Sequence, residues 1–173
     1  MRQSPHSLKS PQLAALTIPT QAGNFTARYS GSGLAALEFP SARKIRTAPT
    51  HSAPAGIRRW HRMTSQAVKT ALAGRAPTGL PPLDFAAGTA FQQRVWNALR
   101  SIGLRKTTSY GELARGLGRA RAARAVGRAC GANPIPLLVP CHRVLAANGR
   151  LGGFSAGLRW KRLLLKREGT RFR

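Results

Sequence analysis

The sequence predicts an α/β (α+β) protein, with a small sheet-and-helix unit in its first half and a mostly helical second half. Two patterns lead to this prediction. Apolar and polar residues alternate within residues 24–39, as in a pair of strands, whereas apolar residues recur at helical spacing in later segments. Between these patterns, "GRAPTGLPPLDFAAG" has the composition of a linker. We therefore expect a loose tail over residues 1–20, an N-terminal domain over 21–84 and a C-terminal domain over 85–173.

The expected tail contains three prolines, and its longest apolar run is "LAAL". Such a run is too short for the hydrophobic region of a secretion signal. The sequence also shows neither a long apolar run nor a basic amphipathic helix of the kind that binds membranes. We expect a cytoplasmic protein with no membrane partner.

The N-terminal domain is predicted to contain a hairpin, a loop and a helix. Alternating apolar residues around a glycine-rich turn predict the hairpin within residues 24–39. Residues 41–56 are rich in Ser, Ala, Pro and basic residues, which favours a loop. Apolar spacing then predicts a helix over residues 57–72, which Gly74 and Pro77 end.

The C-terminal domain is predicted to begin with two helices that share one capping pattern. Thr89 stands three residues before Gln92, at the start of a segment with an apolar stripe. Ser109 and Glu112 repeat this spacing and predict a helix over residues 110–117. Because Glu112 fits a cap, we do not expect it to act as a catalyst.

A second short helix is predicted within "RARAARAVGRACGAN", after a break at Gly118. Arg121, Arg124 and Arg128 are spaced by three and four residues, which places them near one face of a helix. Two short helices joined by a tight turn, the second one small-sided and basic, are typical of a helix-turn-helix. An arginine face that only meets solvent explains the same spacing, and the segment alone does not separate the two interpretations.

The charge of the chain points to a polyanionic partner. Lys and Arg number 29 against four Asp and Glu, which gives a formal net charge of +25. The basic residues are concentrated in the second half. Nucleic acid is therefore the first partner to consider, and its binding should weaken steeply as salt rises.

The cysteines and histidines do not predict a metal site. Cys130 and Cys141 are expected to be free, because disulfides are rare in the cytoplasm. The four histidines are His6, His51, His61 and His142. None of them forms a cluster at zinc-finger spacing, so we predict no metal and no cofactor.

Reactive side chains follow an apolar segment in "PIPLLVPCHRVLAANG". A thiol of ordinary pKa is barely ionised at neutral pH, so a nucleophilic Cys141 needs a base, a helix N-terminus or a dry pocket. Pro140 is compatible with a new turn that starts at Cys141 and brings backbone N–H groups to the sulfur. Adjacent helical side chains diverge, so we expect His142 to reach the thiol through a water molecule.

A histidine base usually needs a carboxylate to orient it. The chain offers only Glu38, Asp84, Glu112 and Glu168. Glu112 fits a cap, while Glu38 and Asp84 precede the basic half, so Glu168 is the best candidate by elimination. A Cys-His pair is weak evidence by itself, and an inert buried thiol is its default interpretation.

The surrounding sequence changes that interpretation. The run "SYGELA…RAARAVGRACGANPIPLLVPCHRVLAANGRLGGFSAGLRWKRLLLKREG" closely resembles the C-terminal domain of O6-alkylguanine-DNA alkyltransferases, over roughly residues 85–169. "FTARYSGSGLAALEFP" and "LPPLDFAAGTAFQQRVW" are similar, more loosely, to the small ribonuclease-H-like domain of that family.

The resemblance implies a protein that binds double-stranded DNA containing O6-alkylguanine, with O4-alkylthymine as a second possible substrate. The damaged base would rotate out of the stack, at a cost of about a few kcal/mol, and Cys141 would take its alkyl group irreversibly. His142 would act as the base through water, Glu168 would orient it, and Tyr110 would donate its hydroxyl to the guanine. Each molecule would act once, as a monomer without a cofactor.

The resemblance also implies residues that contact DNA. Arg124 would enter the stack where the nucleotide has left, and Asn133 would tie the helix-turn-helix to the active-site turn. Ser155 would lie in the loop that closes over the base, and Val144 would offer it a backbone contact. Further DNA contacts are expected at Arg121, Ala123 and Arg128. Phe154 stands where the family usually has Tyr, so one hydroxyl contact is missing.

Three other functions compete with this one. A lesion-sensing relative would bind damaged DNA without chemistry, but such relatives typically replace the cysteine that is present here. A thiol hydrolase with a Cys-His-Glu triad would need an oxyanion hole and have little use for a basic, alanine-rich helix. A basic RNA-binding protein would leave "PCHR" unexplained.

Overall fold

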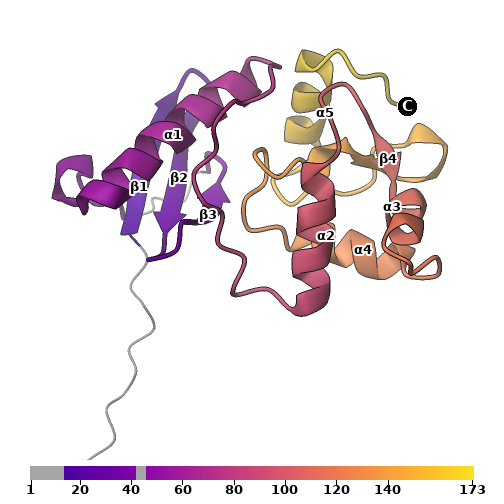
Figure 1. Ribbon diagram of the computed structural model, residues 1–173. Coiled ribbons are helices and arrows are strands. Elements are labelled where there is room, and N and C mark those ends of the chain that lie inside the picture. The colour runs from indigo at the N-terminus through magenta and orange to yellow at the C-terminus, as the bar shows by residue number, and fades with distance from the viewer. Residues whose placement is uncertain (1–13, 42–45) are drawn as a thin grey trace, which may run out of the picture.

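A computed structural model of the chain describes residues 14–41 and 46–173. Its first half holds a sheet of three antiparallel strands, β1 (Ala14–Thr20), β2 (Gly23–Tyr29) and β3 (Leu34–Glu38), in that order. Helix α1 (Ala55–Leu72) lies along this sheet (Figure 1). A mostly helical half follows, which confirms the predicted α/β class.

The prediction of a loose tail over residues 1–20 is wrong for residues 14–20, which form strand β1. Residues 14–20 pair with β2 along their whole length. Leu16 and Ile18 are fully buried, so this segment has the two-residue periodicity of a strand. Pro19 lacks an N–H group but is tolerated, because β1 is an edge strand that pairs on one side only. The first thirteen residues of the predicted tail lie outside the described part of the chain.

Two predicted elements of the first half are confirmed. The hairpin within residues 24–39 is formed by β2 and β3, and the helix over residues 57–72 is α1, which begins two residues earlier, after Pro54. Gly74 has a φ of +70°, and its N–H donates to the Ala71 carbonyl at 3.0 Å. A glycine in this left-handed conformation is a common helix end, as predicted from the sequence.

The segments predicted as loop and linker contain short regular pieces. One 3-10 turn, η1 (Thr50–Ser52), lies in the predicted loop over residues 41–56, of which residues 42–45 are outside the described part. In the predicted linker, the N–H of Asp84 donates to the Leu34 carbonyl at 2.8 Å, so this segment runs beside β3.

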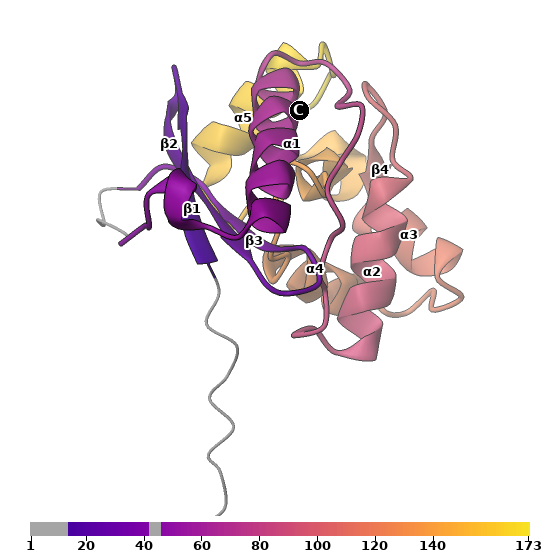
Figure 2. The same cartoon turned by 60° about the vertical axis from the view of Figure 1, so that its left-hand side comes forward.

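The second half contains α2 (Ala90–Arg100), β4 (Thr108–Ser109), α3 (Tyr110–Gly116), α4 (Ala123–Gly131), η2 (Cys141–Arg143), β5 (Val144–Leu145), η3 (Ala147–Gly149) and α5 (Leu158–Arg167). Both predicted capping boxes are confirmed, with Thr89 and Gln92 at α2 and Ser109 and Glu112 at α3. Helices α2, α3 and α4 gather on the side of the molecule away from β1 (Figure 2). No helix within residues 14–41 and 46–173 is long and apolar enough to cross a membrane.

One hydrophobic core extends through both halves. It includes Phe25 of β2, Val68 of α1, Leu99 of α2 and Leu164 of α5. The N-terminal sheet is therefore packed against the helical half, and the domain boundary near residue 85 stays a prediction.

Candidate active site

Cys141 is the first residue of η2, a single 3-10 turn that follows Pro140. The predicted start of a new turn at this cysteine is thereby confirmed. The N–H of Cys141 donates to the Val139 carbonyl at 2.8 Å, and η2 leads directly into β5, which pairs in parallel with β4. Cys141 is only 4% exposed, so little of it meets solvent.

A cavity of about 250 Å³ lies at Cys141. Its walls are formed by Tyr110, Gly127, Cys130, Gly131, Cys141, Gly153, Phe154 and Ser155. This volume is roughly that of eight molecules of liquid water, so the cavity is small. Cys130 is buried in its wall.

His142 and Arg143 both bind the carboxylate of Glu168, the C-cap residue that directly follows α5. His142 Nε2 lies 2.9 Å from Glu168 Oε1. Arg143 donates to the same carboxylate from Nε at 3.1 and 3.3 Å and from Nη2 at 3.0 Å. The structure thus brings together His142 and Glu168, the pair that elimination among the acids selected.

The surroundings of this network set its charges. Burial lowers the pKa of His142, against the hydrogen bond and charge of Glu168, so the imidazole is neutral at pH 7. Burial would raise the pKa of Glu168, but the hydrogen bonds from His142 and Arg143 hold it below its ordinary value. An ionised Glu168 accepts the Nε2–H, which leaves Nδ1 without a proton. His142 Nδ1 is buried and has no hydrogen-bond partner among the described residues.

The thiol itself is neutral in the free protein. Burial raises the pKa of Cys141 to about 11. A contact with the Asn133 side chain, the charge of Lys161 and the N–H groups of Cys141 and His142 lower it, but burial outweighs them. The expected backbone contacts are therefore present at the sulfur, and they do not ionise it.

Both thiols are expected to react slowly with iodoacetamide at neutral pH. Burial raises the pKa of Cys130 to about 12 and that of Cys141 to about 11, and only a thiolate is alkylated readily. Peptide mass spectrometry after timed labelling should show rates that still rise between pH 7 and 10. Unfolding in guanidinium should remove the protection. A rate for native Cys141 that levels off by pH 8 would contradict a neutral thiol.

Lys161 is a site residue that the sequence interpretation missed. It lies on α5 and is 0% exposed. Its Nζ donates to the Val144 carbonyl at 2.6 Å and to the Gly153 carbonyl at 3.1 Å. Burial lowers the pKa of Lys161 to about 8, and its positive charge lowers the pKa of Cys141. Lys161 therefore joins the backbone of β5, directly after the Cys141 turn, to that of Gly153 in the cavity wall, and it places a cation near the sulfur.

Tyr110 opens α3 and faces the loop that precedes α5. A Cβ placed on Gly152, whose φ is +65°, would stand 3.0 Å from the Tyr110 hydroxyl oxygen, so the loop backbone passes close to the ring. Burial raises the pKa of Tyr110, which keeps the hydroxyl able to donate. In the same loop, the Phe154 ring lies 6.5 Å from that of His142, centroid to centroid, and Ser155 is exposed at the rim.

Asn133 links the end of α4 to the segment before Cys141. It is buried, and its Nδ2 donates to the Val139 carbonyl at 2.8 Å. Its Oδ1 accepts the N–H of Ile135 at 3.1 Å. These two bonds hold the chain where it turns towards the thiol.

Helices α3 and α4 pack against each other as the predicted pair of short helices. Arg124 and Arg128 are exposed on α4, whereas Val126 on its other face is fully buried. The prediction that Arg121, Arg124 and Arg128 share one helical face is wrong for Arg121, because α4 begins only at Ala123. Arg121 lies, exposed, in the turn that connects the two helices.

The exposed arginines of α4 have no carboxylate partner among the described residues. The four acids are engaged elsewhere: Glu38 by Arg28, Asp84 by Ser30, Glu112 in the α3 cap, and Glu168 by His142 and Arg143. These cations are thus available to a polyanion.

Neither cysteine forms a disulfide, and no three metal-binding side chains come together, in the part of the chain that the structure describes. His6 lies outside that part.

The second half of the chain matches a known protein family. The family model for the DNA binding domain of 6-O-methylguanine DNA methyltransferase matches residues 90–170. A methylated-DNA–protein-cysteine methyltransferase of Methanosarcina acetivorans is 53% identical over 83 residues, which are 48% of this chain and 53% of the relative. The Mycobacterium bovis protein of the same name is 55% identical over 84 residues, 49% and 51% of the two chains. The matches span about half the length of these curated relatives.

A solved structure extends the similarity to both halves. The crystal structure of Mycobacterium tuberculosis OGT in complex with DNA has 38% sequence identity and a TM-score of 0.72 to this chain. The match covers 88% of this chain and 90% of the other. From this agreement in sequence and in fold, the chain belongs to the O6-methylguanine-DNA methyltransferase family.

Proposed function

We propose that this protein repairs double-stranded DNA by transferring alkyl groups from O6 of guanine to Cys141. The observation that carries the proposal is the Cys141 thiol at a small cavity, followed directly in the chain by the neutral imidazole of His142. Nε2 of this imidazole binds the ionised carboxylate of Glu168, and its Nδ1 is unprotonated. The names of the curated relatives and the DNA complex of the M. tuberculosis protein support the same activity.

In the transfer, the sulfur of Cys141 attacks the alkyl carbon, so an S–C bond forms while the C–O6 bond breaks. The thiol proton passes through a water molecule to Nδ1 of His142, and the charge of Glu168 stabilises the imidazolium. Guanine takes the electron pair of the broken bond, with a hydrogen bond from Tyr110, and is then protonated. Overall, the thiol hydrogen is exchanged for the alkyl group.

Proton removal must accompany the attack. The pKa of Cys141 is about 11, far above that of His142, which lies below its ordinary value. A free thiolate is therefore scarce before the lesion binds. The nearby charge of Lys161 stabilises negative charge as it grows on the sulfur.

The lesion has to leave the double helix to reach this cavity. In our proposal α4 lies against the DNA, Arg124 fills the gap in the stack, and Arg121 and Arg128 bind nearby phosphates. Ser155 and the Val144 carbonyl would contact the flipped base. The product is a thioether, which has no ready route back to a thiol, so each molecule would act once.

Intact-protein and peptide mass spectrometry after mixing with excess duplex DNA containing O6-methylguanine tests this function. One added methyl group on the Cys141 peptide is expected, with one equivalent of lesion consumed and no transfer to Cys141→Ala. Lesion-selective binding by the folded protein without any transfer would contradict it and indicate a damage-sensing DNA-binding protein.

A further inference from the structure

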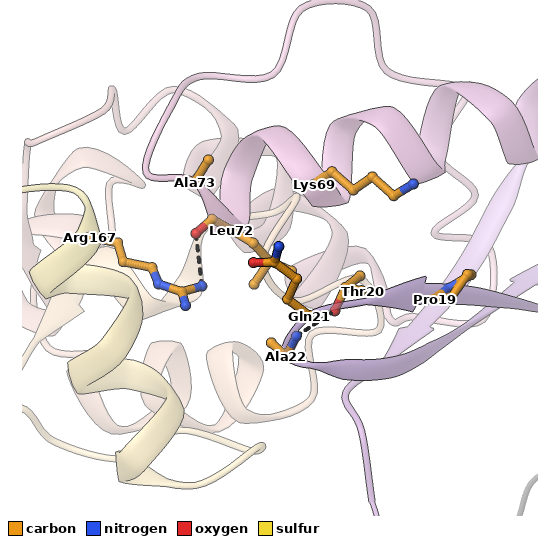
Figure 3. A pocket seen from close by; sticks show the side chains of 8 residues that line it. All are labelled: Pro19, Thr20, Gln21, Ala22, Lys69, Leu72, Ala73 and Arg167. Atoms are coloured by element: carbon orange, nitrogen blue, oxygen red, sulfur yellow. Dashed lines mark hydrogen bonds between the residues drawn. The ribbon is translucent and has the colours of Figure 1, made fainter.

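The C-terminal ends of α1 and α5 meet beside a cavity of about 880 Å³ (Figure 3). Arg167, the last residue of α5, reaches towards α1, and its Nη1 donates to the Leu72 carbonyl at 2.9 Å. Carbonyls in the last turn of a helix have no partner within it, so this guanidinium both caps α1 and joins the helices. Lys69, another cation of the cavity wall, extends away from Arg167. The cations therefore do not converge on a ligand, and the junction itself is the notable feature.

Gly74 makes the second contact between these helix ends. A Cβ at Gly74 would stand 2.1 Å from the Arg167 carbonyl oxygen and 3.3 Å from the Glu168 nitrogen. Any side chain there would collide with backbone, which cannot swing aside as a flexible side chain can. The end of α1 thus lies directly on the peptide group that joins Arg167 to Glu168.

Glu168 is held on its other side by the active site. Its carboxylate is 5% exposed and binds His142 and Arg143. Its N–H donates to the Leu164 carbonyl at 3.0 Å, as the cap of α5. A shift of the Arg167–Glu168 peptide would therefore move the carboxylate relative to His142, because the side chain has only three bonds between backbone and carboxylate.

We propose that Gly74 and Arg167 are positioning residues that hold Glu168 against His142, so that the N-terminal half of the molecule takes part in the active site. The inference rests on the proposed alkyl transfer. It assigns a functional role to the helix end at Gly74, more than 60 residues before Cys141 in the sequence.

Gly74→Ala and Gly79→Ala form a matched pair for the test. The two glycines have φ angles of +70° and +73°, so alanine is strained at both, but a Cβ at Gly79 would have no atom within 4 Å. We expect Gly74→Ala to lower the single-turnover rate of methyl transfer at saturating DNA by about tenfold to a hundredfold, the effect of a displacement near 1 Å. Gly79→Ala is expected to transfer at the wild-type rate.

The pH profile separates positioning from a loss of folded protein. Besides Glu168, the charged or titratable groups around His142 are Lys161 from α5 and Cys141 and Arg143 from η2. Burial, Arg143 and Lys161 lower the pKa of His142, and Glu168 raises it. In Gly74→Ala a displaced Glu168 raises the pKa of His142 less, so the acidic limb of the rate profile should move to lower pH. A smaller fraction of folded protein would reduce the amplitude and leave that limb in place.

Arg167→Ala and Lys166→Ala provide a second pair, should Gly74→Ala fail to fold. Both residues are exposed, and both variants lose one positive charge. Only Arg167→Ala loses the bond to Leu72, so it should react several-fold more slowly than Lys166→Ala. Equal rates and equal profiles within each pair of folded variants would overturn the positioning role. Failure of the wild-type protein to transfer methyl at all would instead refute the proposed function.

Discussion

Glu168→Gln is expected to lower the rate of methyl transfer by about 10⁴-fold, the scale of effect when a histidine base loses its ionised partner. Glutamine keeps the length and one acceptor oxygen, but it carries no charge to stabilise the imidazolium of His142. Single-turnover kinetics at saturating DNA measure this effect. Since Glu168 raises the pKa of His142, the acidic limb of the rate profile should also move to lower pH.

Stability has to be measured beside the rate. Glu168→Gln leaves the buried Arg143 without its carboxylate, and breaking a buried ion pair in this way costs about 3–5 kcal/mol. Urea unfolding should show this loss, so rates are compared under conditions in which both proteins are folded. Glu112→Gln is the matched control, because glutamine can also complete the capping box at α3. A folded Glu168→Gln protein that reacts at the wild-type rate would remove Glu168 from the mechanism.

Features with a short-range physical cause were predictable from the sequence. The capping boxes at Thr89 and Ser109 were recognisable because the partners are three residues apart. The hairpin of β2 and β3 was recognisable because alternation and a glycine-rich turn occur within one segment. Glu168 could be selected because the chain has only four acids, although its role in the reaction stays a proposal.

Features that depend on tertiary packing were missed or misplaced. Strand β1 was assigned to the tail because "LAALTIPT" is short and ends near a proline, and its pairing with β2 became visible only in the fold. The start of α4 was predicted too early. Arginine and alanine both favour helix, so the residues before Ala123 contain no local signal that marks the start. The meeting of Gly74 with Arg167 joins residues far apart in the sequence, and no local pattern predicts it.

Lys161 did carry a signal that went unused. It is one of several basic residues in "LRWKRLLLKRE", and composition does not distinguish it from the others. Helical spacing does, since Lys161, Leu164, Leu165 and Glu168 fall on one face at intervals of three, four and seven residues. A lysine on the apolar face of a helix, in line with a buried glutamate, indicates a buried cation and was a reason to expect a functional residue there.

Lys161→Met is expected to separate activity from stability. Methionine has a similar length, but it cannot donate to the carbonyls of Val144 and Gly153. Two unpaired buried carbonyls cost about 1–3 kcal/mol each. Removing a buried ammonium that has no carboxylate partner among the described residues offsets that cost. The free energy of unfolding should therefore change little.

The rate of transfer should nevertheless fall by about 10²-fold, because a fixed positive group near the developing thiolate is lost and Gly153 of the cavity wall is no longer fastened to β5. Single-turnover kinetics and urea unfolding of the same samples measure both quantities, with the exposed Lys166→Met as a control on the same helix. The pKa of Cys141 should rise further in Lys161→Met, so its iodoacetamide labelling should slow as well. Transfer at the wild-type rate in a folded Lys161→Met protein would show that the buried lysine serves only the packing of α5. Among the described residues, Asn133 and the backbone N–H groups of Cys141 and His142 would then be the groups that favour the thiolate at Cys141.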